Sequence, residues 1–263
     1  MVVDQYLVHR ARLGDVFVLS AEVEGEQLFA AVSVPSWHER MPNHQGSLPE
    51  LIVLEILRQC GYLMAHSALG MPGDWHLVTT ALALEWRATP PTVRADVDFT
   101  CTVTGRVREG DGGHLAFHAE LLSHGDMIAT GELEARCLAP RHYAAIRGFA
   151  ERASRSHANL DAPTHDGVSG PGRPVRWNDQ DRFLFNRRGD HVVSMALVDA
   201  VLADAASSST SGNVSIRMEF LRFAEQSAAI LLERETLGTI GQDLWLLRQA
   251  GQVIARAVTR PVV

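Results

Sequence analysis

The stretch "LPELIVLEILRQCGYLMAH", residues 48–66, decides the fold class. Its length, Pro49 near its start and the break at residues 70–73 predict a single long helix. A helix on a protein surface shows a polar stripe, whereas the part "LIVLEIL" is apolar on nearly all sides. We therefore expect this helix to lie between a sheet and further covering elements, with the carboxylate of Glu55 in apolar surroundings.

Extended segments surround this helix. One extended region covers residues 16–34, before the helix. After it, residues 95–105 ("ADVDFTCTVTG") alternate between apolar and polar, which is the pattern of a half-buried strand that begins at Ala95. Residues 114–122 and 127–139 alternate in the same way around a turn at residues 123–126. The order predicts a strand, a long helix and then an antiparallel meander.

The same order returns in the second half of the chain. A short helix at about 141–156 and a Gly- and Pro-rich linker at 156–174 precede a helix at 190–206, followed by strands within 213–225, 227–237, 243–249 and 252–259. "LALEW" (82–86) even matches "IRMEF" (216–220) in type and order. We infer a duplicated α+β unit, with the two sheets joined edge to edge and both helices on one side. The expected division is 1–139, a helix and linker at 140–174, and 175–263.

The composition excludes several classes of function. The net charge of −7 disfavours a nucleic-acid binder, and all 24 basic residues are arginine. Without lysine the chain has neither a Schiff-base amine nor a Walker A loop. The three cysteines form no CxxC pair, and no apolar run is long enough to cross a membrane. We expect a cytoplasmic protein that needs no cofactor.

Glu55 is the strongest candidate for a catalytic residue. A buried carboxylate must be neutral or be held by a cation and hydrogen bonds, and both states suit general acid–base catalysis. Arg58 and Gln59 follow at helical spacing and are expected on its polar side. The alternative is an ordinary surface pair between Glu55 and Arg58.

Two histidines and one arginine complete the candidates that the residues themselves suggest. His38 and His44 precede the helix and are candidates to share proton transfer, although either is also an ordinary loop residue; their spacing disfavours a metal site. If residues 214–222 form a regular strand, Arg222 ends a row of inward side chains and needs an anion, such as a phosphate or Glu55. A β-bulge would turn it outward, and a structural ion pair is a further alternative.

The helix motif resembles those of hotdog dehydratases that act on 3-hydroxyacyl carrier proteins, with Pro49 six residues before Glu55 and Gln59 after it. It is more similar still to the A-factor biosynthesis hotdog family, the AfsA-like γ-butyrolactone synthases. The segments that carry this resemblance are "YLVHRARLGDVFV", "VPSWHERM", "LEILRQCGYLMAHSALGMP", "DHVVSMALVDAVLADAA" and "FLRFAE".

The resemblance implies a tandem double hotdog that transfers a β-ketoacyl group from acyl carrier protein to dihydroxyacetone phosphate. It assigns catalysis to Glu55 and Arg222, and it makes Asp190 and His191 further binding candidates beside Arg58, Gln59, His38 and His44. The second copy has Asp199, Leu202 and Ala203 where glutamate, arginine and glutamine are usual, which favours one site, on the first helix. The chain is then a monomeric pseudo-dimer or a homodimer.

The sequence is also compatible with two other functions. One is a different hotdog reaction on an acyl thioester, either dehydration or hydrolysis. The other is a non-catalytic module that binds an acyl group.

Overall fold

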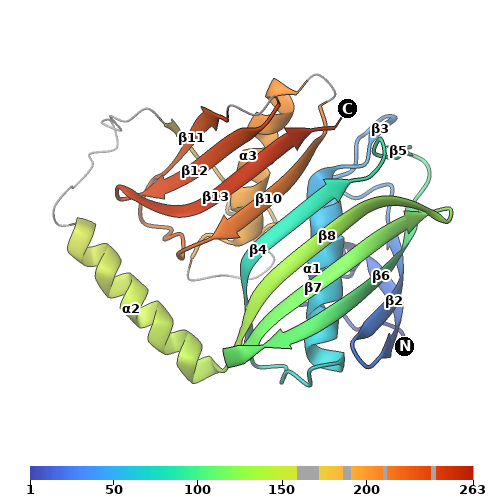
Figure 1. The fold of residues 1–263 in the computed structure, drawn as a ribbon, viewed down its shortest axis with the longest axis horizontal. Coiled ribbons are helices and arrows are strands. Elements are labelled where there is room, and N and C mark those ends of the chain that lie inside the picture. Colours follow the sequence, from blue (N-terminus) through green and yellow to red (C-terminus); the bar gives the residue numbers. More distant parts are fainter. Residues whose placement is uncertain (159–171, 186–190, 210–211, 238–240, 263) are drawn as a thin grey trace.

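The computed structural model describes residues 1–158, 172–185, 191–209, 212–237 and 241–262. Both halves contribute to one 11-stranded sheet in the order β1-β2-β6-β7-β8-β4-β10-β13-β12-β11-β9 (Figure 1). The strands of the first half are β1 (Val18–Glu24), β2 (Gln27–Val34), β3 (Gly46–Ser47), β4 (His76–Trp86), β5 (Thr92–Val93), β6 (Phe99–Gly110), β7 (His114–Ser123) and β8 (Asp126–Leu138). Those of the second half are β9 (Arg173–Pro174), β10 (Val214–Phe220), β11 (Ile230–Thr236), β12 (Asp243–Gln249) and β13 (Gln252–Pro261).

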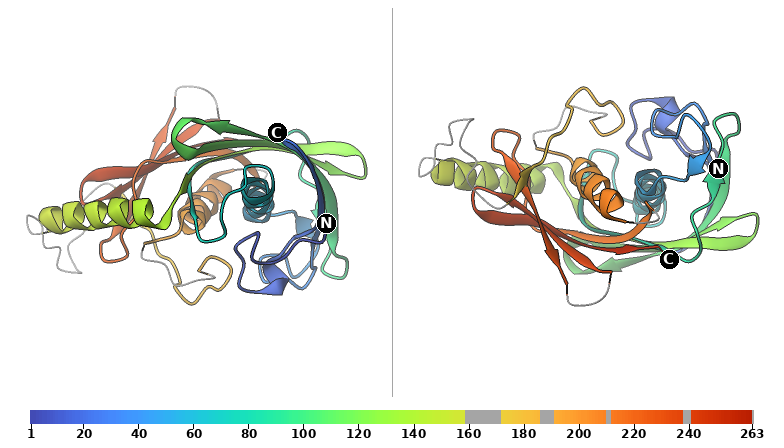
Figure 2. Two further views of the ribbon diagram at one scale, coloured as in Figure 1. Left: turned by 90° about the horizontal axis from the view of Figure 1, so that it is seen from below. Right: turned by 90° about the horizontal axis from the view of Figure 1, so that it is seen from above.

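Three α-helices accompany these strands in the described residues: α1 (Glu50–Ser67), α2 (Pro140–Ala158) and α3 (Ser194–Ser208). Figure 2 shows α1 and α3 next to each other on the same face of the sheet, and the two helices are in contact. This confirms the predicted α+β tandem hotdog architecture. No helix within the described residues is both long and apolar enough to cross a membrane. The proposed division of the chain into three parts stays a prediction.

The two repeated segments join the halves. β4 pairs antiparallel with β10, so that Leu84 lies opposite Ile216 and Leu82 opposite Met218. All four side chains are buried. The duplicated residues therefore meet across the centre of the sheet, which explains why "LALEW" and "IRMEF" share their pattern: each needs apolar side chains toward the helices and backbone pairing toward the other copy.

Two glycines let α1 lie unusually close to the sheet. A Cβ atom added to Gly61 on α1 would lie 2.1 Å from Leu133 Cδ2 of β8, and one added to Gly131 of β8 would lie 2.1 Å from Leu57 Cδ1 of α1. The helix and the strand thus each present a glycine to a leucine of the other. This close approach buries α1 along most of its length and holds Glu55 inside the packed layer between helix and sheet.

One predicted strand starts later than the alternation suggested. β6 begins at Phe99, and Val97, an apolar position of the alternating pattern, is 53% exposed. The reason is a local turn: Arg94 and Asp96 form two hydrogen bonds, at 3.0 and 2.9 Å. Asp98 accepts a hydrogen bond from the backbone N–H of Ser36 at 2.8 Å. The prediction of a strand from Ala95 is therefore wrong for residues 95–98.

We predict that Gly131→Ala lowers the free energy of unfolding by about 1–3 kcal/mol, because Leu57 must leave its place in a packed core. Urea denaturation monitored by circular dichroism measures this loss. Gly73→Ala is the control, since a Cβ at Gly73 meets nothing within 4 Å. Equal midpoints for the two variants would show that α1 does not pack against β8 as closely as described.

Candidate active site

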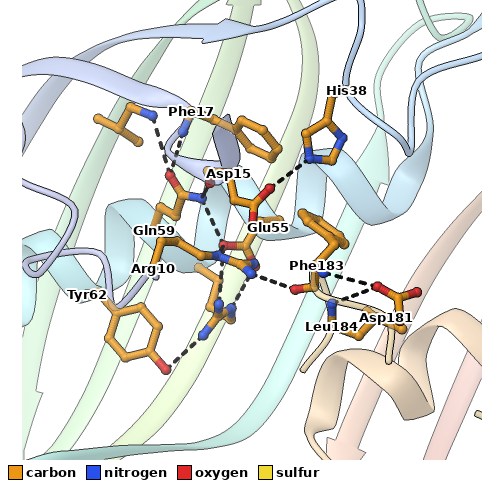
Figure 3. A network of polar contacts seen from close by, with 12 residues as sticks. Arg10, Asp15, Phe17, His38, Glu55, Gln59, Tyr62, Asp181, Phe183 and Leu184 are labelled. Atoms are coloured by element: carbon orange, nitrogen blue, oxygen red, sulfur yellow. Dashed lines mark hydrogen bonds and ion pairs between the residues drawn. The ribbon is translucent and has the colours of Figure 1, made fainter. Parts of the chain in front are cut away.

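Glu55 is fully buried on α1, and its carboxylate is surrounded by N–H donors (Figure 3). Arg10 Nε lies 2.7 Å from Oε1, and an Arg10 terminal nitrogen contacts Oε2. Arg58 Nε lies 2.8 Å from Oε2, and Gln59 Nε2 lies 2.9 Å from Oε1. Burial by itself raises the pKa of Glu55, but the charges and hydrogen bonds of the two arginines outweigh burial and hold that pKa below its ordinary value. The group is an ionised carboxylate.

Arg10 connects this carboxylate to the second half of the chain. Its terminal nitrogen Nη1 donates to the carbonyl oxygen of Phe183 at 2.6 Å, and its guanidinium lies over the Phe183 ring, 4.8 Å from the centroid. The arginine is almost completely buried. Three separate segments, namely the N-terminal residues, α1 and the loop before α3, therefore meet at one guanidinium.

Gln59 connects the same carboxylate to a carboxylate–imidazole pair. Its Nε2 also donates to the backbone oxygen of Asp15 at 2.6 Å, and its Oε1 accepts from the backbone N–H of Phe17 at 2.9 Å. The Asp15 carboxylate lies 3.3 Å from His38 Nε2. His38 is 3% exposed and lies edge-on to the rings of Phe17 and Phe183. Gln59 thus holds the turn that brings Asp15 to His38.

The hydrogen bonds of His38 define which ring nitrogen carries the proton. The backbone N–H of Arg40 donates a weak hydrogen bond to Nδ1 at 3.2 Å, so Nδ1 has the lone pair. We therefore assign the proton to Nε2, which faces the Asp15 carboxylate. The second oxygen of Asp15 has no hydrogen-bond partner within the described residues, and Arg12 Nε lies 4.0 Å away. Asp15 and His38 thus form a buried, hydrogen-bonded dyad.

A related contact occurs at α3. Arg40, from the loop before α1, contacts Asp181 and lies 3.3 Å from the carboxylate of Asp199 on α3. Its guanidinium lies 5.7 Å from the centroid of the Phe183 ring. Both helix acids therefore meet an arginine, and both arginines lie against Phe183. We call this region the seam; its residues are Arg10, Asp15, His38, Arg40, Glu55, Arg58, Gln59, Asp181, Phe183 and Asp199.

The structure brings four of the predicted residues together: Glu55, Arg58, Gln59 and His38. His44 is exposed and makes none of the contacts of the seam that are described above. His191 lies near α2, with Nδ1 3.4 Å from the hydroxyl of Tyr143. Asp190 lies outside the described residues. The binding roles assigned to His44, His191 and Asp190 stay predictions.

Arg222 does not face the core as expected. β10 ends at Phe220, and the backbone N–H groups of Leu221 and Arg222 both donate to the carbonyl oxygen of Ile254, at 2.8 and 3.1 Å. Two consecutive donors on one acceptor mark a β-bulge, which interrupts the alternation of the strand. Arg222 is exposed, so its predicted inward direction is wrong, and the cation that meets Glu55 is Arg10 instead.

Sequence reasoning missed Arg10, Asp15 and Arg40. Asp15 follows Gly14, and a Cβ at Gly14 would lie 2.9 Å from the Trp37 ring, so the "GD" step marks a close contact with the His38 loop. That glycine is a usable signal in retrospect. Arg10 carries no such signal, because nothing local distinguishes it from Arg12. Within the described residues no group of three or more His, Cys, Asp or Glu side chains is arranged to hold a metal.

Comparisons with known proteins agree with this architecture. The model of the A-factor biosynthesis hotdog domain matches residues 1–139, which is more than half of the chain. The chain belongs to the A-factor biosynthesis hotdog family. It is 26% identical over 258 residues to the 2-oxo-3-(phosphooxy)propyl 3-oxoalkanoate synthase of Streptomyces virginiae, covering 89% of this chain and 87% of that one. The Streptomyces coelicolor enzyme of the same name is 26% identical over 215 residues, which are 74% of this chain and 68% of that one.

Solved structures resemble the whole tandem unit of this family member. A 12:0-ACP thioesterase from Umbellularia californica has a TM-score of 0.56 at 15% identity, covering 91% of this chain and 98% of that one. HtdX from Mycobacterium tuberculosis has a TM-score of 0.53 at 13% identity, covering 85% and 91%. At such low identity these likenesses show the hotdog fold alone. The names of the curated relatives support an enzyme.

We predict that Glu55→Gln destabilises this hotdog protein by about 3–5 kcal/mol at neutral pH, because Arg10 and Arg58 lose their buried counter-ion. The lowered pKa means that Glu55 stabilises the fold fully above its ordinary value of 4.5, and this contribution is lost as the pH falls through the folded-state value. The unfolding free energy of the variant should therefore depend less on pH in the acid range. Urea denaturation from about pH 3 to pH 8 measures it.

Glu50→Gln on the same helix is the matched control. Burial raises the pKa of Glu50 despite its hydrogen bonds, so its contribution has the opposite sign: it favours the fold at low pH and is lost as the pH rises through the folded-state value. A Glu55→Gln variant with unchanged stability and acid dependence would contradict the buried ion pair.

Proposed function

We propose that this protein is an acyltransferase that moves a β-ketoacyl group from an acyl carrier protein thioester to the hydroxyl of dihydroxyacetone phosphate. The names of its curated relatives support the substrates, because a 2-oxo-3-(phosphooxy)propyl 3-oxoalkanoate is the ester of a 3-oxo acid with that alcohol. The single structural observation that carries the proposal is the buried dyad of Asp15 and His38 at the seam. Ester formation needs a base beside the attacking hydroxyl, and an oriented histidine suits that task.

The proton follows a short route. The weak hydrogen bond from the Arg40 N–H to His38 Nδ1 is released, and Nδ1 takes the proton of the acceptor hydroxyl while the hydroxyl oxygen bonds to the thioester carbonyl carbon. The carbon–sulfur bond then breaks, and His38 returns the proton to the departing thiolate of the carrier. Asp15 stabilises the intermediate imidazolium through Nε2–H, and its second oxygen adds negative potential. No group is oxidised or reduced, and the step needs no further reactant.

Glu55 has a different role from the proton acceptor expected at first. A carboxylate with a lowered pKa and N–H donors on both oxygens is a weak base. Its proposed role is to position: through Gln59 it fixes the turn that carries Asp15, and through Arg10 it fixes Phe183, which packs on His38. Arg40 is more exposed than Arg10 and Arg58, but its guanidinium already pairs with Asp181 and Asp199 and is therefore a poor site for the phosphate.

We predict that His38→Gln lowers the rate of ester formation by about 10²–10⁴-fold, the usual share of a general base. The assay incubates the enzyme with a β-ketoacyl carrier protein and dihydroxyacetone phosphate and quantifies the phosphorylated ester by mass spectrometry. Asp15→Asn should also reduce the rate, because the amide supports the imidazolium less well. His118→Gln, which changes an exposed histidine on β7, is the control and should retain full activity.

Other products would replace this proposal with one of its alternatives. Release of free β-keto acid without the phosphate acceptor would indicate a thioesterase, and an enoyl thioester formed from a 3-hydroxyacyl carrier would indicate a dehydratase. A bound acyl ligand with no turnover would indicate a binding module. Full activity of His38→Gln would remove the dyad from the mechanism.

A further inference from the structure

Helix α2 differs in charge from the rest of the molecule. It contains four arginines and one glutamate, whereas the whole chain has a net charge of −7. Figure 1 shows that α2 leaves the end of β8 and extends away from the sheet, and Figure 2 shows it projecting beyond the two central helices. Among the α2 arginines whose side chains the structure describes, Arg147 is buried and Arg141 is exposed, so Arg141 presents a positive charge to the solvent.

The inner face of α2 is fixed to the fold. Arg147 forms a buried bidentate ion pair with Glu225, at 2.7 and 3.0 Å, and its guanidinium lies over the Phe223 ring. One turn earlier, Tyr143 stacks on His76 of β4 with 3.9 Å between ring centroids. Residues four apart on a helix share a face, so these contacts define the side of α2 that is attached. The helix is held in one orientation.

The outer face of α2 exposes apolar side chains beside this positive charge. Ile146 is 41% exposed and Phe149 is 70% exposed, and their spacing of three places them on one face. Arg141 and His142 are exposed in the first turn of the same helix. Aromatic residues and arginines are the side chains that dominate the energy of protein–protein contacts. We call Arg141, His142, Ile146 and Phe149 the α2 face.

We propose that the α2 face is the docking surface for the acyl carrier protein, which rests on the acyl transfer proposed above. The argument is charge complementarity: Arg141 beside the apolar Ile146 and Phe149 fits a carrier with an acidic rim around an apolar centre, whereas the net charge of −7 of the whole chain disfavours non-specific attraction of such a carrier. The attached inner face makes the site rigid, so the carrier meets a preformed surface. A membrane with anionic lipids offers similar chemistry and is tested as the competing ligand.

The test measures binding separately from turnover. A fluorescently labelled bacterial holo-acyl carrier protein of fatty-acid synthesis is titrated with the full-length protein, and anisotropy gives the Kd at low and at physiological salt. The double variant Arg141→Glu/Phe149→Ser should weaken binding about tenfold or more, as expected for an interface anchor and a reversed charge. Higher salt should weaken binding of the unmodified protein, because the attraction between exposed charges is screened.

The matched control is Phe29→Ser/Arg106→Glu, which removes an exposed phenylalanine and reverses an exposed arginine on β2 and β6. Its Kd should equal that of the unmodified protein. With a β-ketoacyl N-acetylcysteamine thioester as the donor, the α2 variant should keep its rate of acyl transfer, whereas its KM for the carrier-bound donor should rise. If no acyl transfer is detected, the binding measurement still tests whether the carrier docks on the α2 face, so the two proposals fail separately.

Equal weakening by the α2 and control variants would overturn the proposal. A second result would also overturn it: the unmodified protein shows no measurable binding of the carrier protein but binds vesicles of phosphatidylglycerol, and Arg141→Glu/Phe149→Ser abolishes that vesicle binding. Circular dichroism and the urea midpoint confirm that both variants are folded, and Ile146→Ser provides a single apolar change on the same face as an independent check.

Discussion

The ionised carboxylate of Glu55 is the constraint on which the seam depends. A charge inside an apolar layer is tolerated only when partners from the surrounding structure neutralise it. Here the partners are Arg58 from its own helix and Arg10 from the N-terminal residues. Arg10 also donates a hydrogen bond to the carbonyl oxygen of Phe183 in the second half. The chain must therefore complete its tandem fold before this charge is satisfied. Local helix formation and long-range assembly are coupled through one side chain.

The duplication explains why the two halves of the seam differ. Glu55, Arg58 and Gln59 of α1 correspond in spacing to Asp199, Leu202 and Ala203 of α3. The α3 acid therefore lacks both the i+3 cation and the i+4 amide that hold Glu55, and it depends on Arg40 from the other half. Gln59 also holds the turn that carries Asp15, and Ala203 at the corresponding position of α3 has no amide to do the same. This difference supports the prediction of one site, on the first helix.

The sequence was most informative where the pattern is local. Apolar residues on all sides of residues 51–57 indicated a covered helix. The matching segments at 82–86 and 216–220 indicated the joined sheets, although this inference came from the internal repeat and not from local periodicity. The i+3 and i+4 positions of Arg58 and Gln59 followed from helix geometry. The direction of Arg222 did not, because a bulge at residues 221–222 interrupts the alternation. Arg10 and Asp15 reach the site through tertiary contacts that no local pattern encodes.

The proton chemistry of the seam is decided by how many donors each acid already binds. Glu55 accepts N–H groups on both oxygens beside two guanidinium ions, so a proton added there loses strong electrostatic stabilisation. Asp15 accepts one hydrogen bond from the imidazole of His38 and keeps a buried oxygen without a hydrogen-bond partner within the described residues. The two buried carboxylates, 40 positions apart in the chain, therefore differ in how many donors they bind: Glu55 is saturated and suits the proposed positioning role, whereas Asp15 is not saturated and suits the proposed support of His38.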